Sequence, residues 1–426
     1  MTRLPVRVLA LVLLIAPPAY GETASPKAAP ASTTLLTLAE CYKLAKQQSE
    51  RIAMHQELIA EAEGRFTQAM SGILPRLSLN SSDRWQDGTG SSPFTRKHVP
   101  ERKMTVSQPL FSGFREFAAM AGVKAEKRQR ELEKTRAEHL LAVDVSDAFY
   151  LVLQYRKDLE ALEAIHAALD ERRQELHTRE QLGRSRPSEV VSTEAQRLRV
   201  EAEIQQFQRE AIVVRQLLEF LIGRPIEAPL EDPETMPHVQ DSLETLLAKM
   251  MDRPDVRAAE EAVTVAERQI GIEKADYWPD VDVEGNYFFE RGGVAQEIDW
   301  DAELTVKVPI FEGGQVAGAV SEAKSKARQA RLQLAQIKRQ AILDIKDRYA
   351  EHQAGLAQTQ TLGKAVDAAD ESYRFQLEDY RRNLVSHLDV LEALQNLQDI
   401  RRSYIQAHYE ALRTHWRLRT ATGETP

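Results

Sequence analysis

The sequence predicts a mainly α-helical protein with a small β component, built from two copies of one unit. Residues 310–425 contain no proline although the chain has 18, and such a gap permits long helices. From Val316 to Ala341, small and apolar residues recur in alternating steps of four and three, which is the a/d seam of a coiled coil. A similar arrangement occurs earlier in the chain, at an offset of 200 residues.

Several landmarks share this offset, which indicates an internal duplication. Residues 108–113 and 308–313 both place a proline and a phenylalanine shortly before a glycine. The other pairs at the same offset are Gly183 with Asn383, Glu189 with Asp389, and residues 221–223 with 421–423. The two halves are therefore expected to have the same order of elements.

The N-terminus has the pattern of a secretory signal peptide, which we place at residues 1–21. Arg3 and Arg7 precede the apolar run 8–16, which is too short to span a bilayer, and small residues follow it. Residues 22–35, rich in Ala, Pro, Ser and Thr, are expected to form a flexible leader.

Two structural repeats and a linker make up the rest of the chain. The first repeat, residues 36–223, is predicted to contain a helix (about 37–72), a β-hairpin (about 76–109), a long helix, a turn (183–187) and a second helix. A proline-rich linker is expected at 224–241. The second repeat, residues 242–423, has the same order, with a hairpin at about 280–309, a long helix at about 314–381, a turn at 383–386 and a last helix at about 387–421.

Composition argues against several classes of protein. The net charge of −9 disfavours a nucleic-acid partner. Cys41 is the only cysteine, so an internal disulfide is impossible, and its apolar neighbours predict a buried helix position. The chain has a single Glu-x-x-His, Glu163 to His166, where a carboxylate-bridged metal bundle would need two. We therefore expect no catalytic residue, no metal and no cofactor.

The predicted strands are about nine to eleven residues long, which is the length of a tilted strand that crosses a bilayer. Their alternation gives one apolar and one polar face. Because four strands cannot close a membrane barrel, strands of several chains would have to share one. Two soluble hairpins that cap a helical bundle are the alternative.

Four prolines mark the junction between strands and helices. Pro75 and Pro279 precede strands, whereas Pro109 and Pro309 are predicted to follow them, so all four would lie at one end of the sheet as a swivel to the helices. The aromatic residues Tyr277, Trp278, Phe111 and Phe311 fall at the same level, where an interfacial girdle or core packing would account for them equally well.

These motifs resemble the TolC-like outer membrane efflux protein family. The similarity lies in residues 253–260 (RPDVRAAE), 278–281 (WPDV), 309–314 (PIFEGG) and 36–40 (LTLAE), and it covers about residues 35–423. The resemblance implies a homotrimer with a twelve-stranded barrel in the lipid of the Gram-negative outer membrane and a long α-helical tunnel in the periplasm. It also implies two partners, a periplasmic adaptor and an inner-membrane transporter, and a role as exit duct in efflux or type I secretion.

Site residues follow from the same resemblance. Asp389 and Glu392 correspond to an acidic ring at the periplasmic entrance. Tyr380 and Glu189 correspond to a contact that keeps this entrance closed. The family's archetype carries an arginine after the second turn, and Val385 stands at that position here, so this part of the contact is either absent or supplied by another residue such as Arg184 or Arg186. Gly183, Arg184, Asn383 and Leu384 would form the adaptor-facing turns, with Gly183 and Asn383 left-handed.

Simpler alternatives exist for each part of this interpretation. Asp389 could serve only as an acidic residue in the first turn of a helix, and Tyr380 only as a seam residue. The whole chain could be a periplasmic coiled-coil adaptor or scaffold without a channel. Such a protein would need no lipid-facing strands, which is the feature that separates the two hypotheses.

Overall fold

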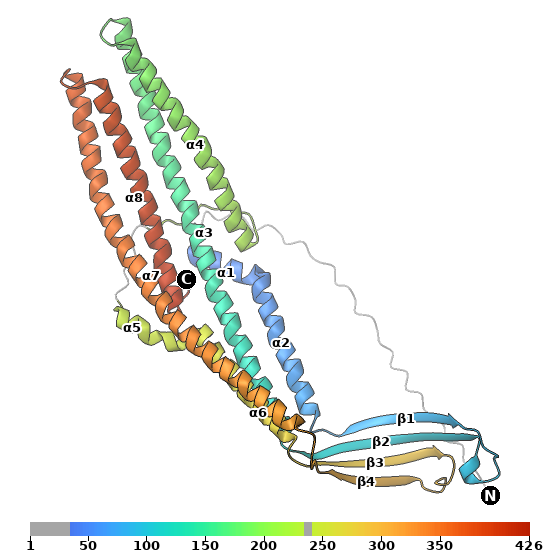
Figure 1. The fold of residues 1–426 in the computed structure, drawn as a ribbon. Helices are drawn as coiled ribbons and strands as arrows, with labels where there is room; N and C mark the ends of the chain where they lie inside the picture. The colour runs from blue at the N-terminus through green and yellow to red at the C-terminus, as the bar shows by residue number, and fades with distance from the viewer. Residues whose placement is uncertain (1–34, 234–240) are drawn as a thin grey trace.

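The computed structural model describes residues 35–233 and 241–426. The molecule is elongated, with a long helical part and a four-stranded sheet at one end (Figure 1). The predicted signal peptide and residues 22–34 of the predicted leader lie outside the described residues. No helix in the described part of the chain is both long and apolar enough to cross a membrane.

The long helices form two pairs at the predicted offset. α3 (Arg115–Gln181) and α7 (Gln315–Arg381) are each 67 residues long. They are followed by α4 (Pro187–Ile222) and α8 (His387–Ala421). The bounds of α7 and α8 agree with the sequence prediction. The buried seam residues of α7 include Val316, Val320, Ala323, Ala327 and Ala341.

The first predicted helix is in fact two helices, α1 (Leu38–Gln48) and α2 (Glu50–Ser71). Ser49 has an extended backbone, and its hydroxyl accepts a hydrogen bond from Ile52 N at 3.4 Å. Serine competes for backbone donors in this way, which favours caps over helix interiors. The prediction of one unbroken helix was therefore wrong.

The first part of the predicted linker packs against the helical core. Leu36 N donates to Pro229 O at 2.9 Å, and Glu231 N donates to Leu36 O at 3.0 Å. Ile226 and Leu230 are buried in the same cluster as Cys41, which itself is buried as predicted. Residues 234–240 of the predicted linker lie outside the described residues.

A buried arginine explains the second-repeat motif at residues 253–260. α5 (Leu243–Ala248) and a short 3-10 helix, η2 (Lys249–Asp252), precede α6 (Pro254–Ala275). Arg253 is only 4% exposed and binds Asp255 through two nitrogens, at 2.8 and 3.1 Å. Its third contact, at 2.9 Å, is Asp344 of α7. The motif thus ties the start of α6 to the long helix beside it.

The sheet has the order β1-β2-β3-β4, with antiparallel neighbours throughout. Its strands are β1 (Arg76–Trp85), β2 (His98–Ser112), β3 (Asp280–Arg291) and β4 (Trp300–Lys307), and a 3-10 turn, η1 (Pro93–Thr95), lies between the first two. The register places Leu79, Met104, Tyr287 and Trp300 in one row across all four strands. Leu79 and Trp300, at the two edges, are 76% and 69% exposed.

The opposite face of the sheet is polar and hydrogen-bonded across the strands. Asn80 donates to Thr105 Oγ1 at 3.2 Å, Thr105 donates to Asn286 Oδ1 at 2.8 Å, and Asn286 donates to Asp301 Oδ1 at 2.9 Å. One exposed apolar face and one polar face are what a membrane barrel with a polar interior requires. β1 and β4 are edges within one chain, so closure needs further strands.

The swivel prolines differ from the prediction at one position. Pro75, Pro279 and Pro309 lie outside the strands, as expected, but Pro109 lies inside β2. Ser107 is the last residue of β2 that pairs with β1, opposite Arg76, but β2 itself continues to Ser112. A register shift in its pairing with β3 follows Pro109. Beyond Ser107 β2 has no neighbour on the β1 side, and a strand tolerates proline where one of its sides has no hydrogen-bond partner.

Three of the four aromatic residues at this junction are exposed, and Phe111 is half-buried. Tyr277, Trp278 and Phe311 are all more than half exposed, and Phe111 meets Trp278 edge to face with ring centroids 6.5 Å apart. Aromatic side chains that stay accessible beside an apolar sheet face fit an interfacial girdle better than core packing.

Asp158 of α3 is fully buried, and this predicts a pH-dependent stability. Burial raises its pKa to about 6, which Arg402 of α8 and the Gln154 amide only partly oppose. A carboxyl with a raised folded-state pKa destabilises the folded state above that pKa, because it must ionise there in a buried site. The free-energy cost of this ionisation decreases as the pH falls toward the ordinary pKa of an aspartate, where the carboxyl becomes protonated in both the folded and the unfolded state.

Asp158→Asn should therefore stabilise the protein at pH 8 by roughly 3 kcal/mol and leave it nearly unchanged at pH 4. Thermal unfolding at pH 4, 6 and 8 measures this. Asp170→Asn is the matched control on α3, because Asp170 is only half-buried and is paired with Arg173 at 3.2 Å. Equal unfolding temperatures for Asp158→Asn and the parent at pH 8 would contradict the prediction.

Candidate functional site

Both helical hairpins end in the same turn geometry, at the pole of the molecule remote from the sheet (Figure 1). Gly183 has φ +68° and Asn383 has φ +60°, so both predicted left-handed positions are confirmed. Arg184 N donates to Arg179 O at 2.8 Å, and Leu384 N donates to Asp379 O at 2.9 Å. These six-to-one hydrogen bonds satisfy the last carbonyl groups of α3 and α7 and define a Schellman motif.

The structure brings together the predicted pair Tyr380 and Glu189. The phenolic oxygen of Tyr380, on α7, donates to Glu189 Oε2, on α4, at 3.0 Å. Ser185 Oγ donates to the same oxygen at 2.5 Å. Burial alone would raise the pKa of Glu189, but these two hydrogen bonds hold it below its usual range. Glu189 is therefore ionised at neutral pH, and its bond to Tyr380 is charge-assisted.

Arginines of α3 supply the positive charge at this contact. The guanidinium carbon of Arg172 lies 4.2 Å from the centre of the Tyr380 ring, and that of Arg179 lies 5.7 Å from it. Val385 instead packs into the apolar cluster around Tyr380. The expectation that Arg184 or Arg186 would substitute is not supported, because both are exposed and neither forms an ion pair within the described residues.

The heptad spacing of α3 marks Arg172 as a core position, although no motif at the turn does so. The buried residues of α3 near the tip follow steps of three and four, and Arg172 occupies one of these seam positions. They are Leu162, Ile165, Leu169, Arg172 and Leu176. An arginine in a heptad core position is costly unless it has specific partners, and here the partners are the Glu175 carboxylate at 2.5 Å and the Tyr380 ring.

His387 forms a second contact between the two hairpins. Its Nε2 lies 2.9 Å from Thr193 Oγ1, and its ring meets Tyr380 edge to face at 5.9 Å. The Thr193 hydroxyl donates to Glu189 O at 2.8 Å, so the imidazole must be the donor to Thr193. Burial and the nearby Arg172 lower the pKa of His387, which keeps it neutral at pH 7. We call Arg172, Glu189, Thr193, Tyr380 and His387 the tip cluster.

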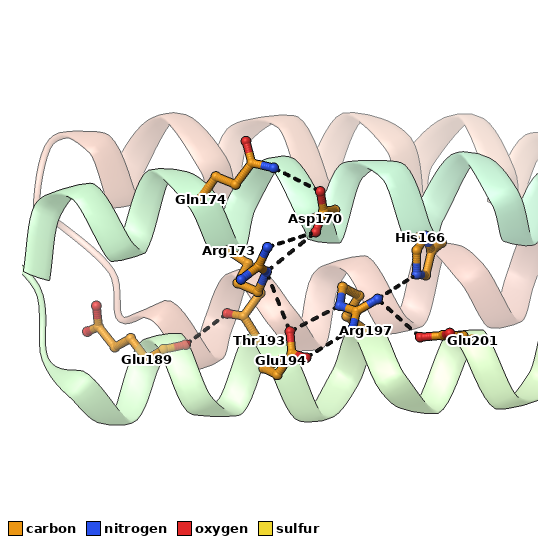
Figure 2. A network of polar contacts seen from close by, with 9 residues as sticks. All are labelled: His166, Asp170, Arg173, Gln174, Glu189, Thr193, Glu194, Arg197 and Glu201. Carbon is orange, nitrogen blue, oxygen red and sulfur yellow. Dashed lines mark hydrogen bonds and ion pairs between the residues drawn. The ribbon is translucent and has the colours of Figure 1, made fainter.

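A chain of ion pairs stiffens the α3–α4 hairpin behind the tip cluster (Figure 2). Arg173 contacts Asp170 of its own helix at 3.2 Å and Glu194 of α4 at 3.5 Å. Arg197 holds Glu194 at 2.9 Å and donates to His166 Nε2 at 3.0 Å. This network fixes the position of α4, and with it the position of Glu189.

The predicted entrance acids lie on α8 just beyond the turn. Asp389 is at the third helical position, where its carboxylate accepts hydrogen bonds from the backbone and hydroxyl of Ser386, each at 2.7 Å. These bonds hold the pKa of Asp389 below its usual range. Glu392 lies one turn further on and forms no ion pair with any described residue. Asp389 thus serves as a helix cap while it remains an exposed anion.

Comparisons with known proteins agree on one family. The chain matches the outer membrane efflux protein family over residues 41–224 and 250–424. It is 23% identical to the alkaline protease secretion protein AprF of Pseudomonas aeruginosa, over 91% of this chain and 84% of that protein. It is 28% identical to nodulation protein T of Rhizobium leguminosarum bv. trifolii, over 40% of this chain but only 38% of that protein.

The fold is shared with a solved outer-membrane protein. VceC from Vibrio cholerae superposes with a TM-score of 0.80 at 21% identity, over 91% of this chain and 96% of that one. The family match spans both repeats and includes the strands, the long helices and the tips described above. The chain belongs to the outer membrane efflux protein family.

Proposed function

We propose that three copies of this chain form a passive exit duct that works with a periplasmic adaptor and an inner-membrane transporter. The observation that carries this proposal is the sheet, which has one exposed apolar face and two open edges in each chain. Backbone groups at those edges cannot stay unpaired in lipid, so strands of neighbouring copies must pair with them. Three copies would give a twelve-stranded barrel, within the range of known membrane barrels.

The helical part supports a duct rather than a scaffold. α3 and α7 are each about 100 Å long at 1.5 Å per residue, which is enough to extend the path from the membrane deep into the periplasm. A periplasmic adaptor without a channel would have no use for the exposed apolar row of the sheet. That alternative is therefore not favoured.

The tips would hold the entrance. In this proposal Asp389 and Glu392 become two stacked rings of carboxylates, which attract cations as acidic rings do in cation pores. The tip cluster ties α3 and α4 to α7 and α8, and so would keep the entrance closed at rest. Engagement of the adaptor at the exposed turns would then release it.

Asn383→Val tests the role of the turns. A β-branched residue is strained at φ +60°, so the turn should lose about 1–2 kcal/mol. We expect weaker cross-linking to a co-produced adaptor, with the oligomeric mass unchanged. Asn383→Gly is the matched control because glycine adopts the same conformation without strain. Equal cross-linking by the valine variant, the glycine variant and the parent would place the adaptor surface elsewhere.

A further inference from the structure

A cavity of about 420 Å³ lies where α2 and α6 begin, and residues of α2, α3, α6 and α7 line it. These helices join the ends of the four strands, so the order of the sheet places them side by side, with α2 and α7 on the outside. Residues of both outer helices, among them His55 of α2 and Ile337 of α7, line the cavity, and we call the face of the layer that they share its concave face. The volume of the cavity is within the usual range of small-molecule sites.

The opposite face of the layer is occupied by α1. Tyr42 donates to Glu138 O of α3 at 3.4 Å, and Lys46 pairs with the Glu138 carboxylate at 2.7 Å. Arg136, which lines the cavity, is two positions from Glu138, and this spacing separates them by about 160° around the helix. In a closed ring of copies, the concave face and its cavity would line the interior of the duct.

The cavity combines an apolar floor with a few polar groups. Its polar lining residues include Arg136 of α3 and Arg51 and His55 of α2. Such a composition, a mostly apolar surface with a few directed polar groups, is typical of sites for small organic molecules. The floor is formed by Ala137, Leu140, Ala258, Ala259, Ala262 and Ile337.

The carboxylates in the lining are already bound to arginines that do not line the cavity. Glu133 accepts hydrogen bonds from Gln129 and Arg130, each at 2.8 Å. Asp255 is held through both oxygens by Arg253, at 2.8 and 3.1 Å. Each acid therefore already has a positively charged partner outside the lining, which leaves Arg51 and Arg136 as the arginines that a bound anion can meet.

Arg136 is the less exposed of the two arginines in the lining. It makes no hydrogen bond within the described residues, and its closest carboxylate oxygen, Asp255 Oδ2, lies 3.6 Å from its Nε. Burial lowers the pKa of Arg136, as expected for a partly dehydrated cation. His55 Nδ1 is buried and has no hydrogen-bond partner there, and Arg51 forms no ion pair in the described part of the chain.

We propose that this cavity binds an amphipathic organic anion, with its acidic group at Arg136 and its apolar ring body on the alanine floor. The donors Arg51 and His55 would complete the contacts with the acidic group. This proposal rests on the proposed duct, since only in the assembled channel does the concave face border the export path. It assigns an anion-selective subsite to the wall, in contrast to the acidic entrance.

Two dyes with the same ring system provide the test. 8-Anilinonaphthalene-1-sulfonate carries one sulfonate, and N-phenyl-1-naphthylamine lacks it. Binding of each is measured by fluorescence to the parent oligomer in nanodiscs, with protein-free nanodiscs subtracted. We expect Arg136→Gln to weaken binding of the sulfonate about tenfold or more, the range for a lost charged hydrogen bond, and to leave binding of the neutral dye unchanged.

Two further variants complete the design. Ala262→Leu fills the cavity and should abolish saturable binding of both dyes. Arg128→Gln is the matched control, because Arg128 is on the same helix but pairs with Glu261 outside the lining. Tighter binding of the neutral dye, or equal sulfonate affinity for Arg136→Gln and Arg128→Gln, would overturn the proposal. Ion conductance of the same preparations is recorded in parallel, so that a conducting oligomer without sulfonate binding refutes this site alone.

Discussion

Tyr380→Phe should open the resting channel. The substitution removes only the hydroxyl that donates to Glu189 and leaves the ring between Arg172 and His387 in place. A hydrogen bond to a charged group contributes roughly 1.5–3 kcal/mol, and each copy of the chain has one. The equilibrium constant for closing the entrance should therefore fall by a factor of about ten or more for each copy of the chain. Single-channel recording in planar bilayers measures the resulting rise in resting conductance.

Tyr373→Phe is the matched control for this experiment. Tyr373 lies two turns earlier on α7, is half-buried, and its hydroxyl makes no hydrogen bond within the described residues. Loss of that hydroxyl should leave the conductance unchanged. If Tyr380→Phe also conducts like the parent, the contact with Glu189 does not hold the entrance shut.

Acidification should have the same effect as Tyr380→Phe. Because the pKa of Glu189 is lowered, its contribution to the stability of the closed state is fully present above the ordinary pKa of a glutamate. That contribution is lost as the pH falls through the lowered pKa. His387 becomes protonated in acid as well, which would place a second cation beside Arg172.

Asp389→Asn combined with Glu392→Gln should reduce the preference of the pore for cations. The amides keep the size of both side chains, and the carbonyl oxygen of the new asparagine can still accept the cap hydrogen bonds from Ser386, so the turn should remain folded. Removal of two carboxylates per copy from a narrow entrance should lower the cation-to-anion permeability ratio about fivefold or more. Reversal potentials in a salt gradient measure this ratio.

The control removes the same charge at a distance from the tip. Asp347→Asn with Glu351→Gln changes two exposed acids of α7 and should alter the permeability ratio little. Block by trivalent cations should be relieved in the tip variant alone. A tip variant that selects and is blocked like the parent would show that Asp389 acts only as a helix cap.

Much of the fold could be predicted because its periodic signals are local. The steps of four and three and the left-handed turn at Asn383 gave the correct bounds of α7 and α8. The break at Ser49 was missed because a single serine cap does not change the helical spacing of the apolar residues on either side of it. Pro109 was misplaced because β2 is longer than its first partner, and that difference depends on the pairing with β3.

The candidate site was only partly accessible from the sequence. Tyr380 and Glu189 came from resemblance, and the structure shows them in contact. The cation at that contact comes from α3, and it depends on how two hairpins meet rather than on any motif at the turn. The cavity around Arg136 involves four helices that are distant in the chain, so its shape follows from their packing alone.

The mass of the purified protein in detergent is the most direct test of the duct. In the described part of each chain, four strands form a sheet with two open edges, so a folded, lipid-compatible sheet requires other copies. Native mass spectrometry should give a single species of about three times the mass of one mature chain. A monodisperse monomer whose circular dichroism still shows the strands would contradict the shared barrel, and with it the channel proposed here.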